Sequence, residues 1–108
     1  MANGILGSAD LAATTYTEIY EVPADTFAVV TVSFVNKDTT SKTVRLAVAK
    51  PAESLPQADD YLEYEAEILP GGVLERTGVV LEAGRKVFGH ASATNVAVVV
   101  YGIETATA

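Results

Sequence analysis

Residues 61 to 68 alternate strictly between two kinds of side chain. The segment reads Tyr-Leu-Glu-Tyr-Glu-Ala-Glu-Ile. Because successive side chains of a β-strand leave opposite faces of the sheet, one face carries Leu, Tyr, Ala and Ile, and the other carries Tyr and the glutamates. A helix would distribute those glutamates around its circumference. The sequence therefore predicts a half-buried β-strand here, with an acidic outer face.

The same two-residue period recurs along most of the chain, and turn-forming residues separate the periodic segments. Pro23-Ala24-Asp25, Pro70-Gly71-Gly72 and Ala83-Gly84-Arg85 are the clearest turns, since proline restricts φ and glycine accepts unusual backbone angles. We predict strands at 14–22, 27–36, 43–49, 61–68, 73–76, 79–82, 86–92 and 96–103. About eight short strands at regular spacing predict an all-β fold, a single antiparallel β-sandwich of jelly-roll or Ig-like type.

The two ends of the chain show weaker periodicity. We therefore predict one β-sandwich domain over residues 1–108, with a mobile N-terminal arm at 1–11 and a short C-terminal tail at 105–108. The longest irregular stretch, 51–60, contains two prolines and three acids, and we predict a loop there. Long loops on a compact domain often make partner contacts.

The last predicted strand, 96–103, is apolar on both faces. Val96, Val98 and Val100 occupy one face, and Ala97, Val99, Tyr101 and Ile103 occupy the other. Such a strand can be a central strand with tolerated surface apolar groups, or a strand covered on both sides by protein, including a partner. The pattern alone leaves both interpretations open.

Composition excludes several classes of partner. The 108 residues include seven bases and 14 acids, for a net charge of −7, and no cysteine. A nucleic-acid-binding protein normally carries a basic surface, and an anionic membrane repels an acidic protein. We therefore expect neither nucleic acid nor membrane as a partner. Without cysteine, disulfides and thiolate metal sites are impossible.

Three groups of residues were candidates for chemistry. The Glu63, Glu65 and Glu67 row could support acid–base hydrolysis, but an exposed row lacks the apolar pocket that raises the pKa of a general acid. Asp59, Asp60 and Glu63 offer oxygen ligands for a hard cation, without the spacing of a calcium loop. The lone His90 has no sequence-defined nucleophile beside it, and we expect it at the surface or an interface. We predict no catalytic residue, no cofactor and no metal.

Five tyrosines supply most of the aromatic surface. Tyrosine is favoured at interfaces, but it also packs in cores with its hydroxyl bonded to the backbone, and both interpretations stay open. If several were exposed along a groove, they could bind a carbohydrate. Tyr16, Tyr20 and Tyr61 are the candidates for that role.

Several segments together carry a resemblance to a known group of proteins. These are ILGSADLAA (5–13), TYTEIYEVPA (15–24), VRLAVA (44–49), DYLEY (60–64), LPGGVLERTG (69–78) and NVAVVVYGIE (95–104). Over nearly its whole length the chain resembles small β-sandwich virion proteins of tailed bacteriophages. The resemblance implies a non-enzymatic structural protein located in the virion, often trimeric, with the major capsid protein or other virion proteins as partners.

The first expectation is a capsid decoration (cement) protein that stabilises the shell. A tail, neck or fibre accessory protein and a carbohydrate-binding module for host attachment are the alternatives. The residues that we expect to contact partners are apolar or aromatic and lie in the arm, the first strand, the long loop, the strand at 61–68 and the last strand. They are Ile5, Leu6, Leu11, Tyr16, Tyr20, Leu55, Tyr61, Val98 and Val100.

Overall fold

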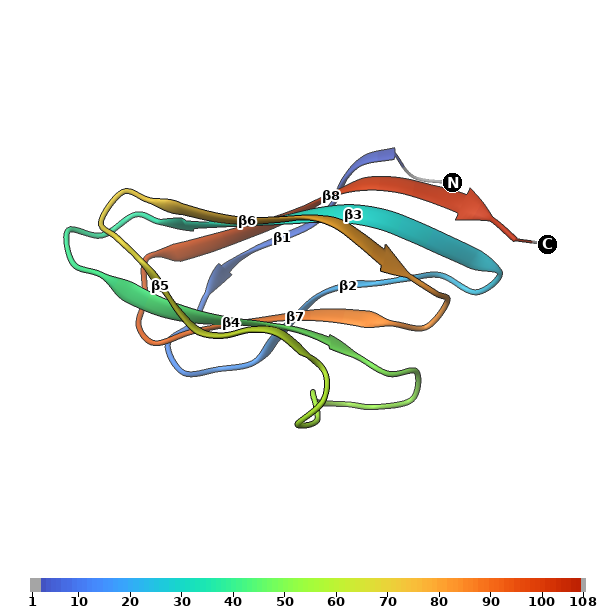
Figure 1. Ribbon diagram of the computed structural model, residues 1–108, viewed down its shortest axis with the longest axis horizontal. Coiled ribbons are helices and arrows are strands. Elements are labelled where there is room, and N and C mark those ends of the chain that lie inside the picture. The colour runs from blue at the N-terminus through green and yellow to red at the C-terminus, as the bar shows by residue number, and fades with distance from the viewer. Residues whose placement is uncertain (1–2, 108) are drawn as a thin grey trace.

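Two antiparallel β-sheets of four strands each pack face to face (Figure 1). The computed structural model describes residues 3–107, and no helix occurs among them. The predicted all-β, antiparallel sandwich is confirmed. The strands are β1 (Asn3–Leu11), β2 (Thr17–Glu21), β3 (Thr26–Asn36), β4 (Lys42–Ala49), β5 (Tyr61–Ile68), β6 (Val73–Leu81), β7 (Lys86–Ala91) and β8 (Val96–Ala106).

The order of the strands identifies the type of sandwich. The first sheet has the order β1-β8-β3-β6, and the second has the order β2-β7-β4-β5. Only β4 and β5 follow each other in the chain within one sheet; every other connection crosses between sheets. This is the strand order of a jelly roll, an eight-stranded double-sheet fold that avoids long open edges. Of the two predicted types, the strand order selects the jelly roll.

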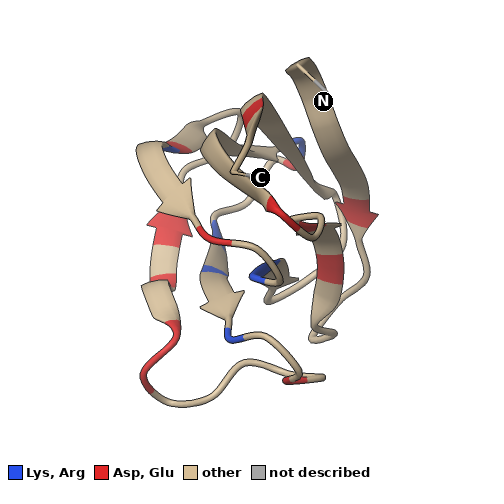
Figure 2. Ribbon diagram, turned by 90° about the vertical axis from the view of Figure 1, so that its right-hand side faces the viewer, with Lys and Arg blue, Asp and Glu red and all other residues tan. Residues whose placement is uncertain are grey.

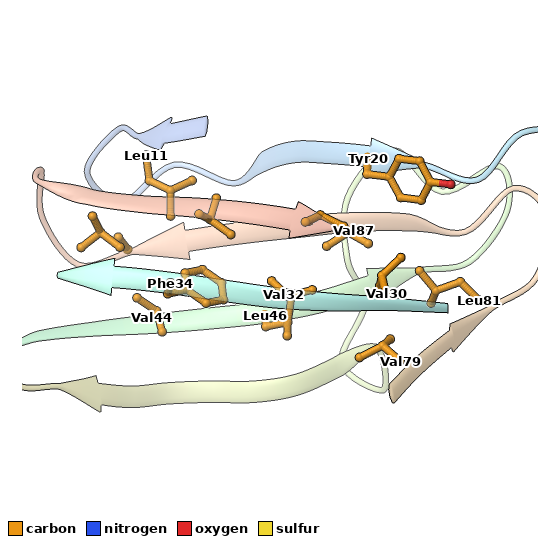
Figure 3. Packing of buried hydrophobic residues seen from close by; sticks show 14 of the residues in the cluster. Leu11, Tyr20, Val30, Val32, Phe34, Val44, Leu46, Val79, Leu81 and Val87 are labelled. Atoms are coloured by element: carbon orange, nitrogen blue, oxygen red, sulfur yellow. The ribbon is translucent and has the colours of Figure 1, made fainter. Parts of the chain in front are cut away.

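The core consists of the inward side chains of both sheets (Figure 3). Strand β3 alternates between buried and half-buried residues along its full length, and its Val30, Val32 and Phe34 are buried, as the two-residue period predicts. From the second sheet, Val44 and Leu46 of β4 meet them, also as predicted. Burying such side chains contributes about 1.5–3 kcal/mol each, so this layer dominates the stability of the fold.

The structure differs from the prediction at both ends of the chain. Residues 3–11, predicted as part of a mobile arm, form β1, which pairs with β8 from Asn3 opposite Ile103 to Leu11 opposite Val96. Leu11 is buried in the core, and Leu6 packs against it. At the other end β8 continues through Ala106, beyond the predicted limit. Residues 1, 2 and 108 of the predicted arm and tail lie outside the described residues.

Strand β6 is continuous, although two short strands were predicted there. The pairing register with β3 shifts at Thr77-Gly78, where Gly78 has a φ of +68°. A bulge absorbs the turn-like residues without ending the strand. The predicted number of strands was therefore correct only because two errors cancelled: β6 was divided into two strands, and β1 was missed.

Close approach of the two sheets explains one glycine near the start of the chain. A Cβ atom on Gly7 of β1 would lie 2.2 Å from the carbonyl oxygen of Ile19 in β2, far inside van der Waals contact. Strands β1 and β2 lie at the same edge of their respective sheets. Gly7 thus lets this edge of the sandwich close tightly.

Candidate functional site

The outer side of the first sheet carries a continuous group of apolar side chains, which we call the apolar face. Val80 of β6, Val29 of β3 and Ile103 of β8 lie directly opposite one another across three strands. In the next row Tyr101 of β8 pairs with Ile5 of β1. Val80, Ile103 and Ile5 are 67%, 52% and 67% exposed. With Val99, these residues make up the apolar face.

An acidic side chain lies beside the apolar face. The Tyr101 hydroxyl donates a hydrogen bond to Glu75 at 2.8 Å, and this carboxylate raises the pKa of Tyr101. Asp10 lies farther along the sheet and pairs with Lys37 at 3.0 Å. Figure 2 shows acidic segments on many strands and loops, and fewer basic ones. The surroundings of the apolar face therefore favour a partner with basic groups around its contact surface.

The predicted contacts from β8 were assigned to the wrong side of the strand. Val98 and Val100 are fully buried between the sheets, so neither can touch a partner. The alternate set faces outward, with Val99 and Tyr101 half-buried and Ile103 exposed. Both sets are apolar, and only the position of the second sheet decides which one is covered. Ile5, also predicted as a contact, does lie on the apolar face.

Tyr20 is a second correction. Its ring is part of the core, and its hydroxyl donates a 2.5 Å hydrogen bond to Glu104. Burial is the largest cause that raises the pKa of Tyr20, and the bond to Glu104 adds to it. Leu6 and Leu11 likewise pack inward. Of the other predicted contacts, Leu55 is exposed on the loop between β4 and β5.

The outer side of the second sheet carries an aromatic cluster. The alternation of β5 breaks at Glu65, whose φ of +54° lies in the left-handed region, and the register with β4 shifts there. Tyr64 was predicted to share the inward face with Leu62 and Ile68, but it is 60% exposed. Its ring meets that of Tyr61 edge to face, with centroids 5.0 Å apart at 89°.

Arg45 and Tyr16 complete the cluster. The guanidinium carbon of Arg45, predicted to point outward, lies 4.4 Å from the centre of the Tyr64 ring. Arg45 also donates to the Tyr16 hydroxyl at 2.8 Å and to Glu65 at 2.7 Å. The Tyr16 and Tyr61 hydroxyls share a 2.5 Å hydrogen bond. Burial and then this bond raise the pKa of Tyr61 to about 12.

A groove of about 470 Å³ lies over this cluster, and the loop after β4 forms its other wall. We call it the aromatic groove. Its lining residues are Tyr16, Arg45, Pro56, Gln57, Ala58, Tyr61 and Tyr64. Two of them, Tyr16 and Tyr61, were predicted at a possible carbohydrate groove. Tyr64 was not, because the alternation of side chains in the sequence does not reveal a bulge.

The loop that walls the groove is held by a buried carboxylate. Asp60 is 3% exposed and accepts hydrogen bonds from the Gln57 backbone N–H and from Lys50 Nζ, both at 2.8 Å. Burial alone would raise the pKa of Asp60, but these bonds outweigh it and hold the pKa below its usual value. Lys50 also binds Asp59 at 2.6 Å. Two of the three hypothetical cation ligands, Asp59 and Asp60, thus bind an ammonium group of the chain itself.

His90 lies beneath the aromatic cluster. It is 8% exposed, and its ring centre is 4.6 Å from that of Tyr16. Its Nδ1 atom is buried without a hydrogen-bond partner in the described part of the chain. Burial is the main cause that lowers the pKa of His90, followed by the charge of Arg45. His90, expected at the surface or an interface, is therefore nearly buried, and its lowered pKa favours the neutral form.

The predicted acidic row is not a continuous array. Glu63 pairs with Arg76 of the opposite sheet at 2.6 Å, and Glu65 pairs with Arg45. Within residues 3–107 no group of three or more acidic or histidine side chains is arranged to hold a metal ion. Nor does this part of the chain contain a helix that could cross a membrane.

The chain matches no protein-family model, no curated protein and no solved structure. The structure places the molecule in the class of jelly-roll sandwiches, with one apolar and one aromatic outer face. Function must be argued from these two faces, since a fold of this kind serves many functions.

Proposed function

We propose that the chain is a non-enzymatic structural protein of a tailed-bacteriophage particle, a decoration protein that binds the capsid through its apolar face. The apolar face carries this proposal. Ile5, Val80 and Ile103 are large, more than half exposed, and placed on three strands of one sheet. Exposed apolar residues scattered singly need no explanation, whereas a contiguous group marks a contact surface.

The occupant that fits this face is a coat protein with an apolar surface surrounded by basic groups. Two copies of this chain would bring net charges of −7 together, with Glu75 beside the face in each copy. Like charges at a contact cost free energy, and complementary ones speed association and select the partner. The virion location implied by the sequence resemblance belongs to the same proposal. So does the implied trimer, whose contacts between copies would lie outside the apolar face. Jelly rolls occur in viral capsid proteins, but also in lectins and cupins, so the fold is compatible with it without selecting it.

The first test is the copy number of this protein in purified particles from its source. Quantitative mass spectrometry against the major coat protein should find hundreds of copies if the protein decorates the shell. A handful per particle would indicate the tail, neck or fibre accessory instead. Absence from particles would contradict the whole proposal.

The second test is addition of purified protein to heads that lack it. Ile103→Lys should abolish binding, because it places a charge in the apolar face. Leu69→Lys is the matched control, since Leu69 is 64% exposed in the turn after β5 and lies outside the face. Equal binding by both variants, or no binding by the unchanged protein, would refute attachment through this face. Light scattering measures whether the free protein is a trimer.

A further inference from the structure

We propose that the aromatic groove is a binding site for a neutral saccharide. This inference concerns the second sheet and does not depend on attachment through the apolar face. The floor of the groove contains two tyrosine rings at 89° to each other, Tyr61 and Tyr64, with Tyr64 60% exposed. Arg45 lies over the Tyr64 ring at 4.4 Å. The part of the ring that remains exposed offers an apolar surface on which the C–H groups of a sugar ring can pack.

The polar groups around the rings suit hydroxyl ligands. Arg45 is a donor only, and its five N–H groups exceed the two bonds made to Glu65 and Tyr16. The Gln57 amide nitrogen donates to the Leu55 carbonyl at 3.2 Å, which leaves its oxygen as an acceptor. The groove therefore presents donors and acceptors side by side, and a sugar hydroxyl can serve as either.

A proline-rich peptide is the main competing ligand, because such peptides also dock in aromatic grooves. Prolines lack the backbone N–H, so these peptides contribute chiefly carbonyl acceptors. They would offer the exposed Gln57 oxygen few donors, whereas a sugar hydroxyl can donate to it. The mixed donor and acceptor set thus favours the saccharide.

Charge selects a neutral saccharide over an acidic one. The positive charge of Arg45 is already paired with Glu65 at 2.7 Å. The whole molecule carries a net charge of −7, which repels anions. No free cation among the lining residues would compensate a carboxylate on the ligand.

The groove is organised before any ligand arrives. Hydrogen bonds between the Tyr16 and Tyr61 hydroxyls and from Arg45 fix the floor. Asp60 holds the Gln57 backbone and so fixes the opposite wall. A site of about 470 Å³ lies within the usual range for small ligands, and prior organisation reduces the entropy lost on binding.

The test uses the unchanged protein, applied to an array of neutral oligosaccharides, acidic oligosaccharides and proline-rich peptides. Hits are titrated by following backbone amide NMR signals at Gln57 and Ala58. Tyr64→Ala should weaken binding about tenfold or more, a factor that equals 1.4 kcal/mol at 25 °C. Tyr64→Phe retains the ring and should bind nearly as well as the unchanged protein.

Tyr101→Ala is the matched control, because Tyr101 lies on the apolar face of the other sheet. Circular dichroism confirms that each variant is folded. Binding to a neutral oligosaccharide that Tyr64→Ala weakens and Tyr101→Ala leaves unchanged would establish the site. Binding only to acidic sugars or proline-rich peptides would overturn the proposal. So would the absence of any neutral ligand, or equal loss in both alanine variants.

Discussion

Adjacent valines in β8 should respond very differently to the same substitution. Val100→Thr and Val99→Thr each replace a methyl group by a hydroxyl of similar size, in a residue type that strands accept. Val100 is fully buried between Gly7 and Val32, its partners in the neighbouring strands. Val99 lies outside, between Ser8 and Ser33. The pair isolates burial from strand propensity.

The expected magnitudes follow from those environments. A hydroxyl buried without a partner costs about 1–3 kcal/mol, so Val100→Thr should reduce the free energy of unfolding by that amount. The melting temperature should then fall by about 5–20 °C, since 1 kcal/mol corresponds to about 4–8 °C in a domain of this size. Val99→Thr should stay within about 0.5 kcal/mol.

Urea unfolding followed by far-ultraviolet circular dichroism measures both free energies. Measurements at several protein concentrations separate folding from association, because a contact between copies makes stability depend on concentration. An equal or larger loss for Val99→Thr, independent of concentration, would refute the assignment of the two faces of β8. It would also remove the basis for the apolar face.

Three further predictions concern polar groups. The pKa of His90 is lowered in the folded state, so the unfolded chain binds more protons. The free energy of unfolding should therefore fall as the pH drops below about 6.5. His90→Gln should make the free energy of unfolding less dependent on pH, as measured by urea titrations at about pH 5 to 8. Asp60→Asn removes the charge that binds Lys50. The free energy of unfolding should fall by about 1–3 kcal/mol, and proteolysis of the loop after β4 should become faster. Tyr20→Phe loses the bond to Glu104 and should lower the melting temperature by several degrees in calorimetry, whereas an unchanged value would show that this bond contributes nothing.

Sequence periodicity predicted most strands because burial acts residue by residue. In β3, the valines and Phe34 alternate with half-buried side chains, and the structure places them as expected. Strand β1 was missed because Gly7 and Asp10 interrupt its apolar pattern. Its side chains pack mainly through Leu6, Ala9 and Leu11, a pattern too sparse to distinguish from an arm.

The candidate sites were harder to predict, for a geometric reason. One extra residue in a strand reverses which face every later side chain occupies. In β5 the pairing with β4 shifts twice, between Tyr61 and Glu63 and again between Glu63 and Ala66, where Glu65 has a left-handed backbone. Tyr64 therefore joins Tyr61 in the aromatic groove, while Leu62, Ala66 and Ile68 still pack on the core. Nothing in the alternation itself marks such a bulge.

The sequence alone predicted where the chain is extended and where it turns. It also predicted that the surplus of acids disfavours anionic partners. Contacts between residues far apart in the chain decided which of the two apolar faces of β8 is buried. They also decided which aromatic rings lie together beneath the loop after β4. Packing of one sheet on the other buries Val98 and Val100 and leaves Ile103 in solvent. That choice arises only when the two sheets meet.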